Sequence, residues 1–228
     1  MRDQVLTWLS DNVPASRLQH ILGVEQMAVE LARHYHLDVE KAAQAGLMHD
    51  LAKYFKPHQL LQMARAECQS ESLPTLYRNQ GVEKQEPSEP SLALEIDPIC
   101  EANPHLLHAD VSAIVARDKF GVKDEEVLEA IANHTLGRPG MSSLSCMVFL
   151  ADSLEPSRGN TPELEALRLL CRQNLYQALW RTCDYCLRFL LDSRCFVHPR
   201  TILTRNWALQ MFNQKMQPLN FPSKKSMS

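Results

Sequence analysis

The chain has 228 residues, of which 45% are hydrophobic and 22% charged, and its formal net charge is −3. These values are typical of a globular protein with one domain, or one domain with an appendage. The slight acidic excess argues against a protein that coats nucleic acid, and no apolar run approaches the ~20 residues that a membrane span needs. With only seven glycines, the sequence favours helix throughout.

Helical spacing of apolar residues predicts an all-α fold. Ser16, Asp38 and Asp124 are the expected N-caps of three helices, and Pro57 is expected to open another. The predicted helices cover residues 2–12, 17–35, 39–54, 57–66, 105–119, 124–135, 142–155, 162–193 and 199–216.

Residues 67–103 interrupt this pattern with Pro, Glu and Ser, which predicts a long loop with a helical turn or two, of the kind that forms lids or mobile excursions. We therefore divide the chain into a core at 1–160 with an insertion at 67–103, C-terminal helices at 161–217 packed on that core, and a flexible tail at 218–228.

The seven cysteines are an odd number without framework spacing, and Met1-Arg2-Asp3-Gln4 does not start a signal peptide. They are interpreted as reduced thiols of a cytoplasmic protein. Cys183 and Cys186 form a C-x-x-C pair inside a helical run, where buried or half-buried thiols are expected instead of a redox or zinc motif.

His49 and Asp50 are the most informative pair in the chain. Adjacent residues on a helix project about 100° apart, so one can bind a metal while the other reaches a second metal or a water. The pair therefore suggests metal-assisted hydrolysis.

Other His and Asp residues stand at the end of rows of apolar or small residues at helical spacing, where they would point inward. A lone inward His is usually a hydrogen-bonded core residue, but a repeat on five helices is not expected by chance. Bound cations would relieve the cost of burying these groups. Four His, two Asp and no Cys suit iron, manganese or zinc in a catalytic site. The residues are His20, His49, Asp50, His108, His134 and Asp152.

Five ordered motifs carry a family resemblance: H-I-L-G-V at 20–24, H-D-L-A-K at 49–53, L-L-H-A-D at 106–110, H-T-L-G at 134–137 and A-D-S-L-E-P-S-R at 151–158. The set resembles the HD-domain metal-dependent phosphohydrolase superfamily, and within it the YqeK-type symmetrical bis(5'-nucleosyl)-tetraphosphatase family. The resemblance implies an HD-domain helical bundle, here with extended C-terminal helices. It also implies a centre of two metal ions, iron first, with manganese or another divalent metal as alternatives.

The implied reaction is hydrolysis of diadenosine tetraphosphate at the middle of its phosphate chain, which gives two ADP. Two cations would share a hydroxide that attacks a central phosphorus, and a nucleoside diphosphate would leave as a stable anion. By motif, His20, His49, Asp50 and Asp152 would surround one metal, and Asp50 would bridge to a second metal held by His108 and His134.

Further residues are carried over by motif to the substrate. Asp50 and Lys53 would be the catalytic residues, and Lys53 would also contact a phosphate oxygen of the substrate. The residues near the nucleotide would be Arg17, Thr135, Gly137 and Arg158. Four of these residues have a simpler alternative: Lys53 as a surface lysine, Arg158 as a solvated cation or carbonyl cap, and Thr135 with Gly137 as a helix C-terminus with a left-handed glycine.

Three departures from the family stand out: the interval between His49 and His108 is long, Ala109 stands where Gly is frequent, and the helices after about 160 extend beyond the usual core. They leave two alternatives open. One is an HD phosphohydrolase for another nucleotide or phosphate ester, and the other is a nucleotide-sensing module without turnover. The expected partner is a small dinucleoside polyphosphate or nucleotide, with no nucleic acid polymer and no membrane. The oligomeric state stays open, with a homodimer as one option.

Overall fold

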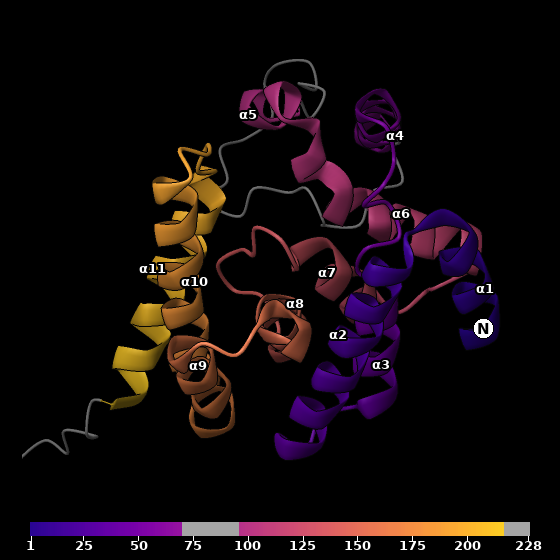
Figure 1. Cartoon of the computed structure of the whole chain (residues 1–228). Helices are drawn as coiled ribbons and strands as arrows, with labels where there is room; N and C mark the ends of the chain where they lie inside the picture. The colour runs from indigo at the N-terminus through magenta and orange to yellow at the C-terminus, as the bar shows by residue number, and fades with distance from the viewer. Residues whose placement is uncertain (70–95, 217–228) are drawn as a thin grey trace, which may run out of the picture.

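The computed structural model describes residues 1–69 and 96–216, and every regular element within them is helical, which confirms the predicted all-α class. Figure 1 shows the helices gathered around α8, with the pair α10 and α11 along one side. The elements are α1 (Arg2–Asn12), α2 (Ala15–His34), α3 (Val39–Met48), α4 (Pro57–Gln69), α5 (Pro98–Ala102), η1 (Pro104–Leu107), α6 (His108–Phe120), α7 (Glu125–Asn133), α8 (Ser143–Leu154), η2 (Pro156–Arg158), α9 (Pro162–Gln173), α10 (Leu175–Asp192) and α11 (Pro199–Met216).

Helix α8 is the central element of the bundle. It packs against α2, α3, α7, α9 and α10, and every side chain from Leu144 to Ala151 is buried. A helix that is apolar on all sides is expected in a protein interior. Asp152 follows this run directly, so its position is set by the best-packed helix of the molecule.

Helices α2 and α3 approach each other closely at Gly46. A Cβ atom at Gly46 would lie 2.8 Å from the Glu25 Cα, which leaves no room for a side chain. Ala42 and Ala45 on the same face are fully buried. The small residues that precede His49 therefore permit this contact, as expected.

Several predicted helix boundaries are confirmed. The helices at 2–12 and 199–216 have the expected bounds, and α4 begins at Pro57. Asp38 and Asp124 cap α3 and α7 by accepting backbone N–H groups. Ser16 is not a cap, because α2 begins one residue earlier and Pro14 occupies the capping position.

Three predicted helices have different bounds in the structure, and in each case the difference falls at a metal-ligand candidate. The helix predicted at 39–54 ends at Met48, the one at 124–135 ends at Asn133, and the one at 105–119 is a 3-10 turn followed by α6. His49 and His134 are thus the residues that end α3 and α7, and His108 is the first residue of α6. In each case the imidazole bonds a carbonyl of the preceding turn. At His49 and His134 this bond competes with continuation of the helix.

The single helix predicted at 162–193 is wrong, because the chain forms α9 and α10 with a break at Asn174. That residue is extended, with φ −157°, and its side chain accepts the Gln177 N–H as the N-cap of α10. Helix α10 then packs against α8, α9 and α11. The division of the chain at residue 160 stays a prediction.

The predicted insertion at 67–103 contains the end of α4 and the short α5. The rest of it, 70–95, and the predicted tail at 218–228 lie outside the described residues. All seven cysteines are free thiols, with Cys183 buried and Cys186 half-buried, as expected. None of the helices in 1–69 and 96–216 combines the length and apolar character that crossing a membrane requires.

Candidate metal centre

The six ligand candidates come from five separate parts of the chain and meet in the interior. His20 lies within α2, and Asp152 lies near the end of α8. His49 with Asp50 follows α3, His108 opens α6 and His134 follows α7. The four imidazoles are at most 5% exposed, so the predicted inward orientation is confirmed.

Three histidines are held in the same way. Each directs its ring Nδ1 to the carbonyl oxygen three residues earlier, with distances of 2.7 Å for His49, 2.6 Å for His108 and 2.7 Å for His134. A carbonyl only accepts, so Nδ1 carries the proton, and the Nε2 lone pair is left for the interior. The local turn therefore sets the tautomer that a metal ligand requires.

His20 is held between two carboxylates instead of by a backbone carbonyl. Its Nδ1 lies 2.8 Å from Oε1 of Glu155, and its Nε2 lies 3.0 Å from Oδ1 of Asp152. Glu155 is 1% exposed and also accepts the Ser157 N–H at 2.7 Å. A Cβ at Gly23 would lie 2.5 Å from the Glu155 carboxylate, so a larger residue at this point of α2 would displace that carboxylate from its present position.

Asp50 occupies the middle of the centre. Its Oδ2 lies 3.4 Å from Nε2 of His49 and 4.0 Å from Nε2 of His20. Its Oδ1 lies 3.3 Å from Nε2 of His108 and 3.5 Å from Nε2 of His134. Two groups with metal-ligating geometry result, and Asp50 belongs to both.

Asp152 lies beside the first of these groups, as predicted for a ligand candidate. Its Oδ1 is 3.7 Å from Nε2 of His49, in addition to its contact with His20. The group of Asp50, His20 and His49 therefore has a second carboxylate beside it. For His108 and His134 the neighbouring carboxylate is that of Asp50.

The donor atoms of these side chains are arranged to bind a pair of cations, and they do not satisfy one another by hydrogen bonds. Nε2 of His49 and Oδ1 of Asp50 are buried without a hydrogen-bond partner. Nε2 of His108 and Nε2 of His134 are 3.1 Å apart, yet with both protons on Nδ1 neither nitrogen can donate. Converging lone pairs of this kind are costly inside a protein unless a cation lies between them.

Ionisation supports the same interpretation. Burial alone would raise the pKa of Asp50, but His49, His108 and His134 hold it well below its ordinary value. Burial lowers the pKa of His108 to about 4. At neutral pH Asp50 is thus a carboxylate and His108 a neutral imidazole, the forms that bind metals. Burial lowers the pKa of His49, but Asp50 and Asp152 outweigh it and raise that pKa, an effect that a bound cation would oppose.

Four of the predicted substrate residues border the centre. Arg17 donates to Oδ2 of Asp50 at 3.0 Å, and Arg158 donates to Oδ1 of Asp152 at 2.6 Å. Nζ of Lys53 and Oγ1 of Thr135 lie 3.2 Å and 3.1 Å from Nε2 of His108. Arg158 also donates to the Asp152 carbonyl, which matches its alternative as a carbonyl cap.

Gly137 lies elsewhere. Its φ is +62°, and a Cβ there would lie 2.4 Å from Cγ2 of Thr204 on α11. The contact with α11 explains the glycine, and its predicted role at the nucleotide stays a prediction. Glu155 is the residue that sequence reasoning did not assign, although the A-D-S-L-E-P-S-R motif contains it.

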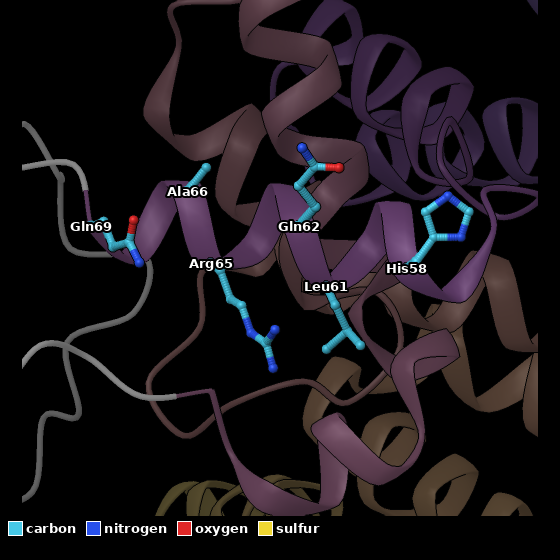
Figure 2. Close-up of a pocket in the computed structure, with 6 residues that line it drawn as sticks. All are labelled: His58, Leu61, Gln62, Arg65, Ala66 and Gln69. Carbon is cyan, nitrogen blue, oxygen red and sulfur yellow. The ribbon is translucent and has the colours of Figure 1, made fainter.

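A surface hollow beside α4 is separate from this centre. Figure 2 shows its lining, with Leu61 and Arg65 pointing into the hollow, and none of the lining residues is a ligand candidate. The lining consists of His58, Leu61, Gln62, Arg65, Ala66 and Gln69.

Comparison with known proteins agrees with this geometry. The family model of the HD domain matches residues 17–157. A relative from Bacillus subtilis, named symmetrical bis(5'-nucleosyl)-tetraphosphatase, is 32% identical over 206 residues, which is 90% of this chain and 96% of the relative. A relative of the same name from Halalkalibacterium halodurans is 30% identical, over 91% of this chain and 97% of its own.

A solved structure gives the same result. A predicted HD superfamily hydrolase involved in NAD metabolism, from Clostridium acetobutylicum, superposes with a TM-score of 0.77 at 32% identity, covering 92% of this chain and 98% of its own. These matched lengths exceed residues 17–157, so the similarity continues into the C-terminal helices. The chain belongs to the HD domain family and is a metal-dependent phosphohydrolase, which confirms the resemblance of its five motifs.

Proposed function

We propose that this phosphohydrolase cleaves diadenosine tetraphosphate, or a similar dinucleoside tetraphosphate, symmetrically into two nucleoside diphosphates. The observation that carries the proposal is the pair of ligand groups that share Asp50, because two adjacent cations suit the phosphoryl oxygens of an anhydride. The names of the Bacillus subtilis and Halalkalibacterium halodurans relatives support the choice of substrate.

The proposed ligand assignment follows the distances. His20, His49, Asp50 and Asp152 would hold one ion, and Asp50, His108 and His134 would hold the other. Iron is the proposed metal, with manganese or another divalent cation as alternatives, because imidazole and carboxylate suit all of them. When bound, such a pair supplies Lewis-acid polarisation of phosphoryl oxygens and lowers the pKa of water.

The cationic side chains around the centre would bind the phosphate chain. The side chains of Arg17 and Arg158 are 22% and 38% exposed, and Lys53 is also exposed, so all three can reach a ligand from solvent. Their present partners include Asp50 and Asp152. Once cations neutralise these carboxylates, the guanidinium groups can turn their N–H groups to phosphate oxygens, which they bind in pairs.

The leaving group imposes little demand on the protein. A nucleoside diphosphate departs as a stable anion, so proton donation by a side chain is not required for bond cleavage. We propose that Lys53, Arg17 and Arg158 instead stabilise the charge that develops on the phosphoryl oxygens.

Product identification tests the proposal. The purified protein is incubated with diadenosine tetraphosphate, and anion-exchange chromatography separates the nucleotides. ADP is the expected sole product, and Asp50→Asn should give no product together with reduced bound metal. Asp118→Asn, at an exposed carboxylate of α6, is the matched control and should match the parent protein.

Other outcomes would reject the assignment. AMP together with ATP would indicate asymmetric cleavage, and faster turnover of a nucleoside monophosphate or a cyclic nucleotide would indicate another phosphate substrate. Tight nucleotide binding without any product would favour a sensing module.

A further inference from the structure

A second cluster of ligand-type side chains lies away from the HD centre, where α5 meets the turn before α11. Asp97, Cys100 and His198 each present one donor atom within 4.8 Å of the other two. Oδ1 of Asp97 and Nε2 of His198 are 3.5 Å apart. Figure 1 shows α5 near the end of the α10–α11 pair at which α11 begins. Two segments far apart in the sequence thus contribute to one cluster.

The cluster leaves a buried polar atom without a partner. His198 is only 7% exposed, and its Nε2 has no hydrogen-bond partner although it points at Asp97. Cys100 is 6% exposed. At 3.5 Å the Asp97 carboxylate is a poor replacement for the water that this nitrogen loses on burial, so a species bound between the two groups would satisfy it better.

We propose that Asp97, Cys100 and His198 bind a divalent cation of the zinc class, at a site separate from the dinuclear centre. One thiolate, one imidazole and one carboxylate form a borderline-soft ligand set that zinc prefers, and three protein ligands leave the fourth tetrahedral position for water. The dinuclear centre has no sulfur ligand, so the two sites differ in chemistry. The cation would link α5 to the start of α11.

Proton and charge balance are simple at this site. In the metal-free ring Nδ1 accepts the Arg200 N–H at 3.1 Å, so the proton is on Nε2. Cation binding moves that proton to Nδ1, gives up this backbone bond, and releases the thiol proton of Cys100 to solvent. The thiolate and the Asp97 carboxylate then neutralise the two charges of the cation. Burial, Asp110 and Asp97 raise the pKa of the Cys100 thiol to about 11, and Arg200 acts in the opposite direction, so a bound cation is needed to form the thiolate at neutral pH.

Cobalt absorption tests the proposal independently of any hydrolase activity. Full-length protein is titrated with Co²⁺, whose bonds to thiolate give a charge-transfer band in the near ultraviolet. The dinuclear centre cannot produce this band, because its ligands are imidazoles and carboxylates. We expect the band in the parent protein and its loss in Cys100→Ser. Cys68→Ser, at a half-buried thiol of α4 outside the cluster, is the matched control and should keep the band.

Further variants separate the two sites. Asp50→Asn should keep the thiolate band, so a failure of the proposed hydrolase function leaves this test intact. Asp97 is 47% exposed and caps α5 by accepting the Ile99 N–H at 2.8 Å, a bond that an asparagine oxygen can keep. Asp97→Asn should therefore leave α5 intact but weaken Co²⁺ binding at this site by about tenfold or more. Absence of the band in the parent protein, its survival in Cys100→Ser, or unchanged affinity in Asp97→Asn would each overturn the proposal. If Cys100→Ser does not fold, the parent titration and Asp97→Asn decide.

Discussion

The orientation of four imidazoles is the feature on which the metal centre depends at the scale of single residues. For His49, His108 and His134 the anchor is a backbone carbonyl three residues earlier, so the correct tautomer is present wherever the local turn forms. The anchor of His20 is a side chain 135 residues away. Only this ligand can be released by changing one side chain without disturbing its own helix.

Glu155→Gln tests that difference. The glutamine can still accept from His20, but its amide has to face the Ser157 N–H, where the native carboxylate accepts. The weaker anchor should lower metal affinity by about tenfold, as loss of a hydrogen bond to a ligand usually does. Competition with a chelator measures the affinity. Glu163→Gln, with a side chain that is 52% exposed on α9, is the control, and equal affinities for the two variants would contradict the assigned role.

Arg158→Ala separates substrate binding from metal binding. If Arg158 binds phosphate, its loss should raise KM by about tenfold or more, the value of a charged hydrogen bond, while bound metal stays unchanged. Arg172→Ala, at a side chain that is 61% exposed, is the control. A fall in metal content would instead show that Arg158 mainly supports Asp152, the carboxylate to which it now donates.

The sequence identifies the ligand candidates more readily than the residues that orient them by hydrogen bonds. His20, His49, His108 and His134 each end an apolar row, and a polar group in such a position demands an explanation. Glu155 gives no comparable signal, because it follows α8 directly and its partner is remote in the sequence.

At the scale of elements, helix ends deliver most of the centre. His49 and His134 end α3 and α7, and His108 starts α6, so their rings converge from three directions while the helices themselves pack behind them. Any change in how these helices approach one another should displace a ligand. The contact between α2 and α3 at Gly46, three residues before His49, is one example, because there a Cβ would meet backbone atoms.

Gly46→Ala should therefore impair both stability and metal binding. The added Cβ would meet backbone atoms of Glu25, which cannot rotate away, so α3 must move from α2. Overpacking of this kind costs about 1–3 kcal/mol in the free energy of unfolding. Urea denaturation measures stability, and metal analysis reports the shift of His49. Gln44→Ala, on the outer part of the same helix, should leave both measurements unchanged.

The joint between α9 and α10 provides a second test at this scale. Asn174→Ala removes the bond from its side chain to the Gln177 N–H, and loss of such an N-cap costs about 1 kcal/mol in the free energy of unfolding. The midpoint of urea denaturation should fall accordingly. Gln173→Ala, at the exposed neighbour, should have no effect, and an equal loss in both variants would show that the cap is not the cause.

Boundaries of helices were the least predictable feature for a physical reason. Apolar periodicity continues across 162–193, so the pattern alone predicts one helix, and only the capping geometry of Asn174 reveals two. Likewise, the apolar face of α3 leads straight to His49, but the imidazole then bonds Gly46 and the helix ends. Side-chain competition for backbone groups decides these cases.

At the scale of the whole molecule, the centre connects elements that the hydrophobic core also holds together. The carboxylate of Asp50 lies next to four imidazoles, which belong to α2, to the end of α3, to α6 and to the end of α7. Asp152 on α8 lies next to two of the same imidazoles. Behind them, α8 packs against α2, α3 and α7. Metal binding and folding should therefore be coupled, because the binding groups converge only in the folded chain.

Removal of metal should lower the thermal stability of the whole domain. A ligand present at a hundred times its Kd adds about 2.7 kcal/mol to the free energy of unfolding, and for a chain of this size that corresponds to about 5–10 °C in Tm. Calorimetry with and without a chelator measures the shift. Asp50→Asn is the informative comparison, because it removes the shared ligand of both ions. Its Tm should lose most of its response to the chelator, and any remaining response should come from the proposed site at Asp97, Cys100 and His198. A full response in this variant would mean that the stabilising metal binds somewhere other than around Asp50.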